Sequence, residues 1–252
     1  MSTRGRPSFP DTAVEWLLPT PREGHPVLLF GQTCAPIAER LAAHRSGLVL
    51  ADTTRAGVRS LMRRAPHGIP ALVMPERLPF IPGAFDGVML HQNLHTFAGA
   101  AIVQEVARVL APGGQLGVSW ITRDDSVPWV RRLMELVRAL DPDAMPGDYG
   151  TTAIATLVNS PYFGNIEERR VRLWVPVARV DLLDMVARRF PTLDPGRRAA
   201  LLADVGQLYE SSARAPAPLL LPYQVACWRA EVDHSEFTSA IELPDPGLPI
   251  RL

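Results

Sequence analysis

Lysine is absent from this chain of 252 residues, so each of its 26 basic residues is an arginine. The absence excludes mechanisms that need a lysine amine, such as Schiff-base catalysis. A lysine-free chain that is also rich in alanine and proline is typical of a GC-rich coding sequence. We therefore read the arginine bias as a property of the coding sequence and assign it no function.

The chain also has only two cysteines, no net charge and no long apolar run. Cys34 and Cys227 are the only cysteines, and their distance in the sequence indicates neither a disulfide framework nor a zinc site. The formal net charge is zero, so no overall field favours nucleic acid or an anionic membrane surface. The first residues lack the apolar core of a signal peptide, and no apolar run approaches a membrane span. We expect a cytoplasmic protein that binds no nucleic acid, spans no membrane and holds no metal.

Short apolar runs alternate with helical patterns through the first half of the chain. The predicted strands cover residues 26–30, 47–51, 71–74, 84–90 and 115–121, and the predicted helices cover residues 11–18, 36–43, 56–64 and 100–110. Asp11 is expected to cap the first of these helices. Runs that are apolar throughout are typical of strands buried on both faces. Strand–helix alternation of this kind predicts a doubly wound α/β fold with a mostly parallel sheet.

The second half of the chain has a different pattern. It predicts helices at residues 128–140, 179–189 and 195–210, strands at residues 167–177 and 219–232, and a loop-rich stretch at residues 141–162. We expect one domain over residues 1–232 with a helical insertion at about 178–212. Residues 233–252 are rich in proline and are expected to form a loosely ordered tail.

Several segments together resemble the class I S-adenosylmethionine-dependent methyltransferases. LPFIPGAFD resembles the family's LPFPDGSFD stretch between the third and fourth strands, and EVARVLAPGG resembles its ExxRVLRPGG turn before the fifth strand. WITRDDSVPW, QNLHTF and PYxxxCW resemble segments of a largely actinobacterial branch of that family. The five segments occupy residues 78–86, 105–114, 120–129, 92–97 and 222–228.

The resemblance implies a Rossmann-like sheet of seven strands, completed by a hairpin with a reversed C-terminal strand. It also implies S-adenosylmethionine as cofactor and methyl transfer as the reaction. The two helices between the last strands would be an insertion near the mouth of the site. The sequence leaves open whether they pack against the domain or cover a substrate.

The glycine-rich cofactor loop of the family is altered in this chain. The family pattern VLDxGxGxG falls on residues 27–35, where only Gly31 is kept. The resemblance implies that Gly31, Gln32 and Thr33 are the cofactor-binding residues of this loop. Leu29 stands where the family has a carboxylate for the cofactor's ammonium, and Thr33 and Ala35 replace glycines. Because glycine serves where the backbone approaches a ligand closely or takes a positive φ, these changes predict an impaired cofactor cradle.

Other positions carry over from the family with fewer changes. Asp52, followed by Thr53, lies where a carboxylate accepts the ribose hydroxyls; its other interpretation is a cap for the next helix. Pro75 and Glu76 fall beside the adenine position, although a proline has no amide hydrogen to donate there.

The end of the fourth strand would face the reaction centre. Gln92 is expected to contact the cofactor there. His95 and His91 are the candidate general bases for an acceptor that must lose a proton. Each histidine also has a purely structural interpretation.

Two functions remain open on these observations. One is an active methyltransferase for an unidentified small molecule or lipid. The other is a catalytically inactive pseudo-methyltransferase that serves as a binding or scaffolding partner, either as a homo-oligomer or beside an active relative. The resemblance over nearly the whole chain, with Asp52, Gln92 and His95, favours the first, whereas the altered cofactor side (Leu29, Thr33, Ala35 and Pro75) favours the second.

Overall fold

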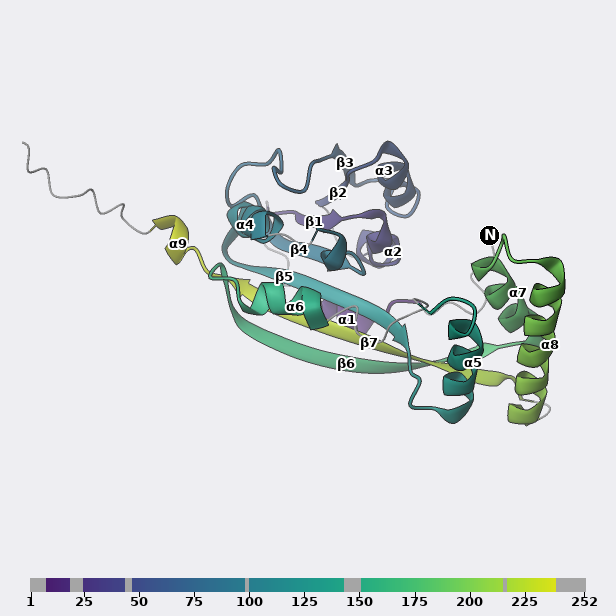
Figure 1. Cartoon of the computed structure of the whole chain (residues 1–252). Helices are drawn as coiled ribbons and strands as arrows, with labels where there is room; N and C mark the ends of the chain where they lie inside the picture. The colour runs from purple at the N-terminus through teal and green to yellow at the C-terminus, as the bar shows by residue number, and fades with distance from the viewer. Residues whose placement is uncertain are drawn as a thin grey trace, which may run out of the picture.

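The computed structural model describes residues 8–18, 25–43, 47–97, 100–142, 151–214 and 217–238. Within these residues seven strands form one sheet in the order β3-β2-β1-β4-β5-β7-β6 (Figure 1). The strands are β1 (Val27–Phe30), β2 (Leu48–Asp52), β3 (Ile69–Leu72), β4 (Phe85–His91), β5 (Leu110–Arg123), β6 (Phe163–Val177) and β7 (Leu219–Val232).

The pairing of these strands confirms the predicted fold class. The first five strands pair in parallel, from β3 at one edge to β5 near the middle. β7 runs antiparallel to both of its neighbours, β5 and β6, and is therefore the reversed strand. The fold is a doubly wound, mostly parallel sheet of the Rossmann-like methyltransferase type.

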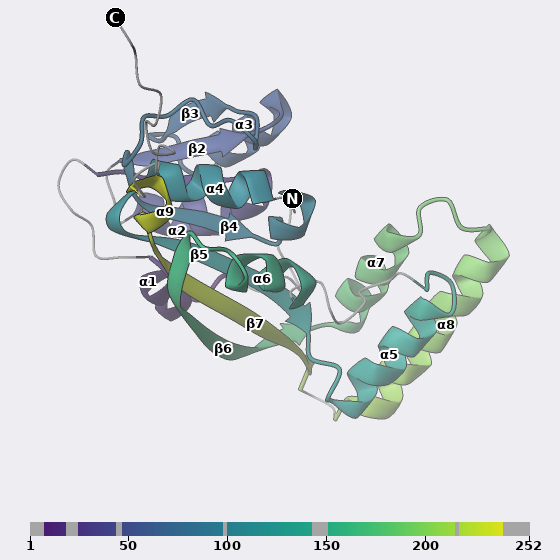
Figure 2. The same ribbon diagram turned by 60° about the vertical axis from the view of Figure 1, so that its left-hand side comes forward.

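Helices cover both faces of the sheet (Figure 2). One face carries α1 (Asp11–Leu17), α2 (Ala35–Ala42) and α3 (Arg55–Met62), and the other carries α4 (Ala100–Val109) and α6 (Thr151–Val158). β1 shows why a continuous apolar run is needed between two such layers. Leu28 and Phe30 are buried on the α4 side, whereas Val27 and Leu29 are buried on the α2 side.

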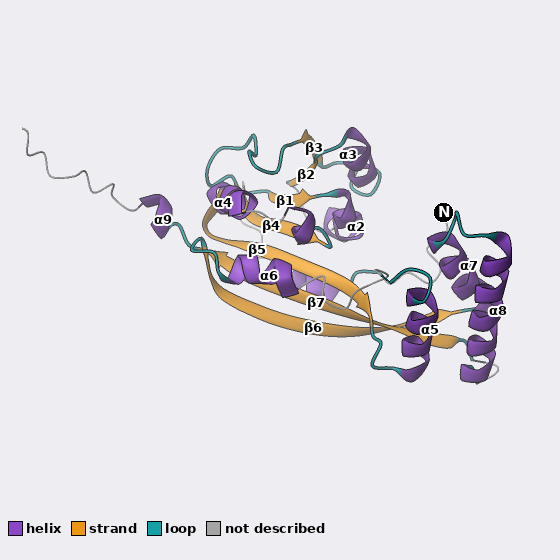
Figure 3. Cartoon of the chain, viewed as in Figure 1, coloured by secondary structure: helices purple, strands orange, loops and turns teal. Residues whose placement is uncertain are grey.

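A third group of helices lies beyond the sheet, at the ends of the long strands β6 and β7 (Figures 1 and 3). It consists of α5 (Pro128–Arg138), α7 (Arg179–Arg189) and α8 (Pro195–Ser212). Leu133, Leu182 and Val205 of these helices share a core with Leu221 and Tyr223 of β7. Both helices predicted between the last two strands are thus present, and α5 packs with them.

Several local predictions were wrong. Residues 151–158 were expected to be loop but form α6, and Pro10 rather than Asp11 is the cap residue of α1. β5 begins at Leu110, before the Pro-Gly-Gly turn that was expected to precede it. The predicted tail begins with a short helix, α9 (Ser235–Thr238), while its residues 239–252 lie outside the described part of the chain.

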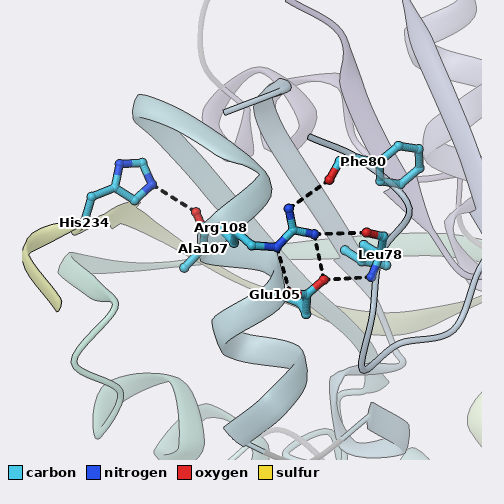
Figure 4. A network of polar contacts seen from close by, with 6 residues as sticks. All are labelled: Leu78, Phe80, Glu105, Ala107, Arg108 and His234. Atoms are coloured by element: carbon cyan, nitrogen blue, oxygen red, sulfur yellow. Dashed lines mark hydrogen bonds and ion pairs between the residues drawn. The ribbon is translucent and has the colours of Figure 1, made fainter. Parts of the chain in front are cut away.

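Two of the segments that carry the family resemblance are joined by one network of polar contacts (Figure 4). The guanidinium group of Arg108 donates to the backbone carbonyls of Leu78 and Phe80 at 2.9 and 2.8 Å. It also donates to the carboxylate of Glu105, which in turn accepts the backbone N–H of Leu78 at 2.7 Å. The ion pair therefore fastens the loop before β4 to α4.

Candidate functional site

The order of the strands places a candidate site at the carboxyl end of β1. From β1 the chain proceeds outward through β2 to β3 and then returns to the other side of β1 as β4. Ligands of doubly wound sheets bind at such a switch point, outside the carboxyl ends of the strands. The residues that follow β1, β2 and β4 meet there, and they include Gly31, Asp52 and Asn93.

Gly31 makes the turn that leaves β1. Its φ is +92°, a conformation that favours glycine, and its N–H donates to the carbonyl of Ala51 at 2.8 Å. A Cβ at this position would lie 2.3 Å from Nδ2 of Asn93. The one glycine that the chain keeps from the family pattern is thus required both by its backbone conformation and by the close approach of the Asn93 side chain.

The rest of the altered loop forms a short 3₁₀ helix, η1 (Gln32–Cys34), that continues into α2. Thr33 has a negative φ, and Ala35 has φ −53° and ψ −40°, so neither position needs a glycine for its backbone. Of the two uses of glycine considered for this loop, only the close approach of a ligand can still apply at positions 33 and 35. The thiol of Cys34 is buried beneath this turn, and burial raises its pKa to about 12, so it is a packed, unreactive side chain.

Leu29 does not point toward the turn. Its side chain is fully buried among Ile37, Leu50 and Met89 on the face that carries α1 and α2. A carboxylate at this position would enter an apolar core without a partner. The chain therefore takes its polar groups for this site from other strands.

Asp52 ends β2, and its carboxylate bonds to the segments that follow β1 and β2. Its carboxylate accepts the backbone N–H of Gln32 at 2.7 Å, and the N–H and hydroxyl of Thr54 at 2.8 and 2.9 Å. The side chain is 6% exposed and packs against Gly57 of α3. Thr54, not Asp52, is the cap of α3, because its hydroxyl accepts the N–H of Gly57. The cap interpretation of Asp52 was wrong, and neighbouring Thr53 is exposed.

Asn93 was not identified from the sequence. It is 5% exposed, and its Nδ2 donates to the carbonyl of Phe30 at 2.6 Å, which ties the end of β4 to the end of β1. Its Oδ1 is buried and has no hydrogen-bond partner among the described residues, and the same is true of the hydroxyl of Thr33. Asn93 lies in the QNLHTF segment that carries the family resemblance, but an asparagine shortly after an apolar strand also fits an ordinary turn.

The two predicted histidines occupy different environments. His91 ends β4, is 3% exposed, and bonds through Nδ1 to the hydroxyl of Ser119 at 2.9 Å, with Phe9 packed edge-on against its ring. Burial lowers its pKa from 6.5 to about 4, so the ring is neutral at pH 7. His95 is exposed on the short helix η2 (Leu94–Phe97).

Gln92 lies between the site and β5. Its φ of 54° is unusual for a residue other than glycine, and such residues are often found at functional sites. Its backbone N–H donates to Ser119 and its side-chain amide donates to the carbonyl of Ile121 at 2.9 Å. The side chain is thereby directed to β5. Pro75 and Glu76 form the turn after β3, between the paired residues Met74 and Arg77, and Glu76 is exposed.

We expect the buried histidine to make folding stability depend on pH. Because the folded pKa of His91 is lower than the unfolded value, the unfolded chain binds more protons between these values. Stability is thus lost as the pH falls from 6.5 toward 4, by about 2 kcal/mol between pH 7 and pH 5. His91→Asn, which offers an amide to Ser119 but does not titrate, should remove most of this dependence in urea unfolding. An equally steep loss in the variant would contradict the assignment.

Within the part of the chain that the structure describes, neither a metal cluster nor a membrane span accompanies this site. Within the described ranges no three His, Cys, Asp or Glu side chains come together as metal ligands. In the same part of the chain no helix is both long enough and apolar enough to cross a bilayer.

Comparison with known proteins identifies the family. Residues 30–118 match the model of a methyltransferase domain. Uncharacterized methyltransferases of Mycobacterium tuberculosis and Mycobacterium bovis are 32% identical to this chain over 240 residues, which cover 90% of either protein. An uncharacterized methyltransferase-like protein of Schizosaccharomyces pombe is 27% identical over 142 residues, which cover 55% of this chain and 56% of that protein.

Solved structures agree on the fold. A candidate type II methyltransferase from Anaeromyxobacter dehalogenans superposes with a TM-score of 0.64 at 18% identity, covering 90% of this chain and 97% of that one. The YcgJ protein of a Bacillus species superposes with a TM-score of 0.51 at 16% identity, and the match covers 86% of this chain and 95% of that one. At these identities the likeness speaks for the fold alone. Together with the sequence relatives, the switch-point site shows that this chain belongs to the class I S-adenosylmethionine-dependent methyltransferase family.

Proposed function

We propose that the chain transfers a methyl group from S-adenosylmethionine to a small-molecule or lipid acceptor. The observation that carries the proposal is Asp52, a buried carboxylate at the end of β2 that bonds to the turn after β1, beside the switch point. A carboxylate has room for about four hydrogen bonds, so this one, which accepts three, still has capacity for a ribose hydroxyl.

The described residues fit two polar groups of the cofactor, the ammonium group of its methionine part and the ribose. Near Gly31, the Thr33 hydroxyl and Asn93 Oδ1 are buried oxygens that lack partners among the described residues, as a site for a ligand ammonium requires. Asp52, whose carboxylate accepts the backbone N–H of Gln32, lies where the ribose would be held. When bound, the cofactor supplies an electrophilic methyl group on a sulfonium.

The protein's own contribution to such a reaction is mainly positioning and exclusion of water. Gln92 fixes the end of β4 to β5 through its bonds to Ser119 and Ile121. His95 is exposed and is the better placed of the two histidines to accept a proton from a bound substrate. His91 is covered by Phe9 and serves the packing of β4.

A catalytically inactive binding or scaffolding protein is the second candidate. It is favoured by the bonds that the Asp52 carboxylate already makes to its own chain, because a ribose would have to compete with them. Such a protein would act as a homo-oligomer or beside an active relative. Cofactor affinity separates the two functions.

We expect titration calorimetry to give micromolar dissociation constants for S-adenosylmethionine and S-adenosylhomocysteine. Asp52→Asn should weaken both by roughly 10- to 100-fold, since it removes the negative charge and replaces one acceptor oxygen by an NH₂ donor. Asp11→Asn, at an exposed carboxylate of α1, is the matched control and should leave both unchanged. No detectable heat at millimolar ligand would refute the methyltransferase and leave the binding or scaffolding role.

A further inference from the structure

Two buried oxygens near Gly31 lack hydrogen-bond partners among the described residues, and they lie in the segments that follow two different strands, β1 and β4. One is the hydroxyl of Thr33 in η1, and the other is Oδ1 of Asn93 after β4. We propose that these two oxygens hold the ammonium group of the cofactor's methionine part, in place of the carboxylate that the family has at the position of Leu29. The inference rests on the proposed function and assigns its residues in this chain.

The orientation of the Asn93 amide is determined by its neighbour. Its Nδ2 lies 2.6 Å from the carbonyl oxygen of Phe30, which can only accept a hydrogen bond. The reversed orientation would bring two acceptor oxygens together at that distance. Oδ1 is therefore the free atom, and it offers an acceptor to the site.

The two side chains lie around the same point. The position that a Cβ of Gly31 would take is 2.3 Å from Nδ2 and 3.4 Å from Cγ of Asn93, and 3.5 Å from the hydroxyl oxygen of Thr33. The Thr33 hydroxyl oxygen and Oδ1 of Asn93 are both buried, so the water that would otherwise satisfy them is largely excluded. The absence of a side chain at Gly31 permits both side chains to approach this turn.

The chemistry of the pair selects a donor. A buried acceptor without a partner is unfavourable in the folded state, and an ammonium group with three N–H donors can satisfy two such acceptors at once. A phosphate or carboxylate would find no donor in Oδ1 of Asn93. The pair therefore suits a cationic amine, such as the one that S-adenosylmethionine and S-adenosylhomocysteine carry.

Thr33→Val tests the assignment, because valine keeps the shape of threonine and removes only the hydroxyl. We expect the affinity for S-adenosylhomocysteine to fall roughly 10-fold in titration calorimetry, as for a lost hydrogen bond to a charged group. Affinity for 5′-methylthioadenosine, which has the adenosine and the sulfur but no ammonium, should change less than about twofold. Thr33→Ser retains the hydroxyl and should bind both ligands as the original chain does.

Stability of the ligand-free protein gives a second readout. Since the hydroxyl of Thr33 has no partner in the described structure, Thr33→Val should leave the melting temperature unchanged or raise it. If the hydroxyl of Thr33 instead bonded to another group of the protein, Thr33→Val would lower the melting temperature. Asn93→Leu should show the same ligand preference as Thr33→Val, but it should lower stability because it also removes the bond to Phe30.

The outcomes separate the inference from the proposed function. If the original chain binds S-adenosylhomocysteine and Thr33→Val binds it equally well, the inference is overturned and the function stands. Equal weakening of both ligands by Thr33→Val would indicate a distorted turn and would also overturn the inference. Failure of the original chain to bind S-adenosylhomocysteine would remove the proposed function itself.

Discussion

Gly57→Ala is expected to destabilise the protein by about 3 kcal/mol, although glycine-to-alanine changes inside helices usually stabilise by up to about 1 kcal/mol. A Cβ on Gly57 would lie 2.1 to 2.3 Å from the carboxylate atoms of Asp52. That carboxylate cannot simply rotate away, because it is buried and accepts hydrogen bonds from Gln32 and Thr54. The alanine must therefore expel Asp52 from its position or shift α3. Urea unfolding measures the loss.

A double-mutant cycle identifies the cause. In an Asp52→Ala background the clash is absent, so Gly57→Ala should be neutral or stabilising there. The two changes would then show a coupling energy of about 3 kcal/mol. If Gly57→Ala costs the same in both backgrounds, Asp52 is not the group that requires the glycine. Weaker binding of S-adenosylhomocysteine by Gly57→Ala alone would connect this packing with the site.

The fold was predictable because its strands are apolar on both sides. Runs such as residues 26–30 and 47–51 carry that signal within a few residues, and the alternation with helices then requires a parallel sheet. α6 was missed because five of the eight residues of Thr151–Val158 are β-branched, three threonines, one isoleucine and one valine, and such residues favour helices only weakly. Only the packing of this segment against the sheet makes it helical.

The position of the site in the fold could be predicted from the sequence, but only some of its residues could. Asp52 and Gln92 follow buried strands, and strand ends of this kind meet at one edge of the sheet. The partners of these residues depend on contacts far apart in the sequence, such as Asn93 with Phe30. The absence of a carboxylate at position 29 could be read from the sequence, whereas the unpartnered Oδ1 of Asn93 could not. Restoring an aspartate at position 29, an obvious repair on the sequence alone, would place a charge in the apolar core.

Arg108→Met is the second change with a large expected effect, about 3 kcal/mol of lost stability in urea unfolding. The substitution leaves the carbonyls of Leu78 and Phe80 without their donor and the Glu105 carboxylate without its cation (Figure 4). Arg108→Lys should recover only part of the loss, because an ammonium group lacks the planar fork that bonds the carboxylate and two carbonyls together. The loop before β4 should lose order in hydrogen exchange as well.

A matched control separates this network from an ordinary surface ion pair. Arg188 pairs with Asp184 one helical turn away, but these side chains are 72% and 60% exposed, against 25% and 16% for Arg108 and Glu105. Arg188→Met should therefore cost less than about 0.5 kcal/mol. Equal losses from the two arginine variants would show that the bonds to the loop contribute nothing beyond the pairing of charges.

The ionisation of Glu105 gives the same network a dependence on pH. The guanidinium group of Arg108 lowers the pKa of Glu105 in the folded protein, and the N–H of Leu78 adds to that effect. A carboxylate whose folded pKa is depressed contributes stability above its unfolded pKa, and it loses that contribution as the pH falls through the folded value. The original chain should therefore lose more stability on acidification below about pH 4.5 than Arg108→Met does. Parallel acid profiles for the two proteins would mean that Glu105 is stabilised by other groups, and the role of Arg108 would then be limited to its bonds with the loop.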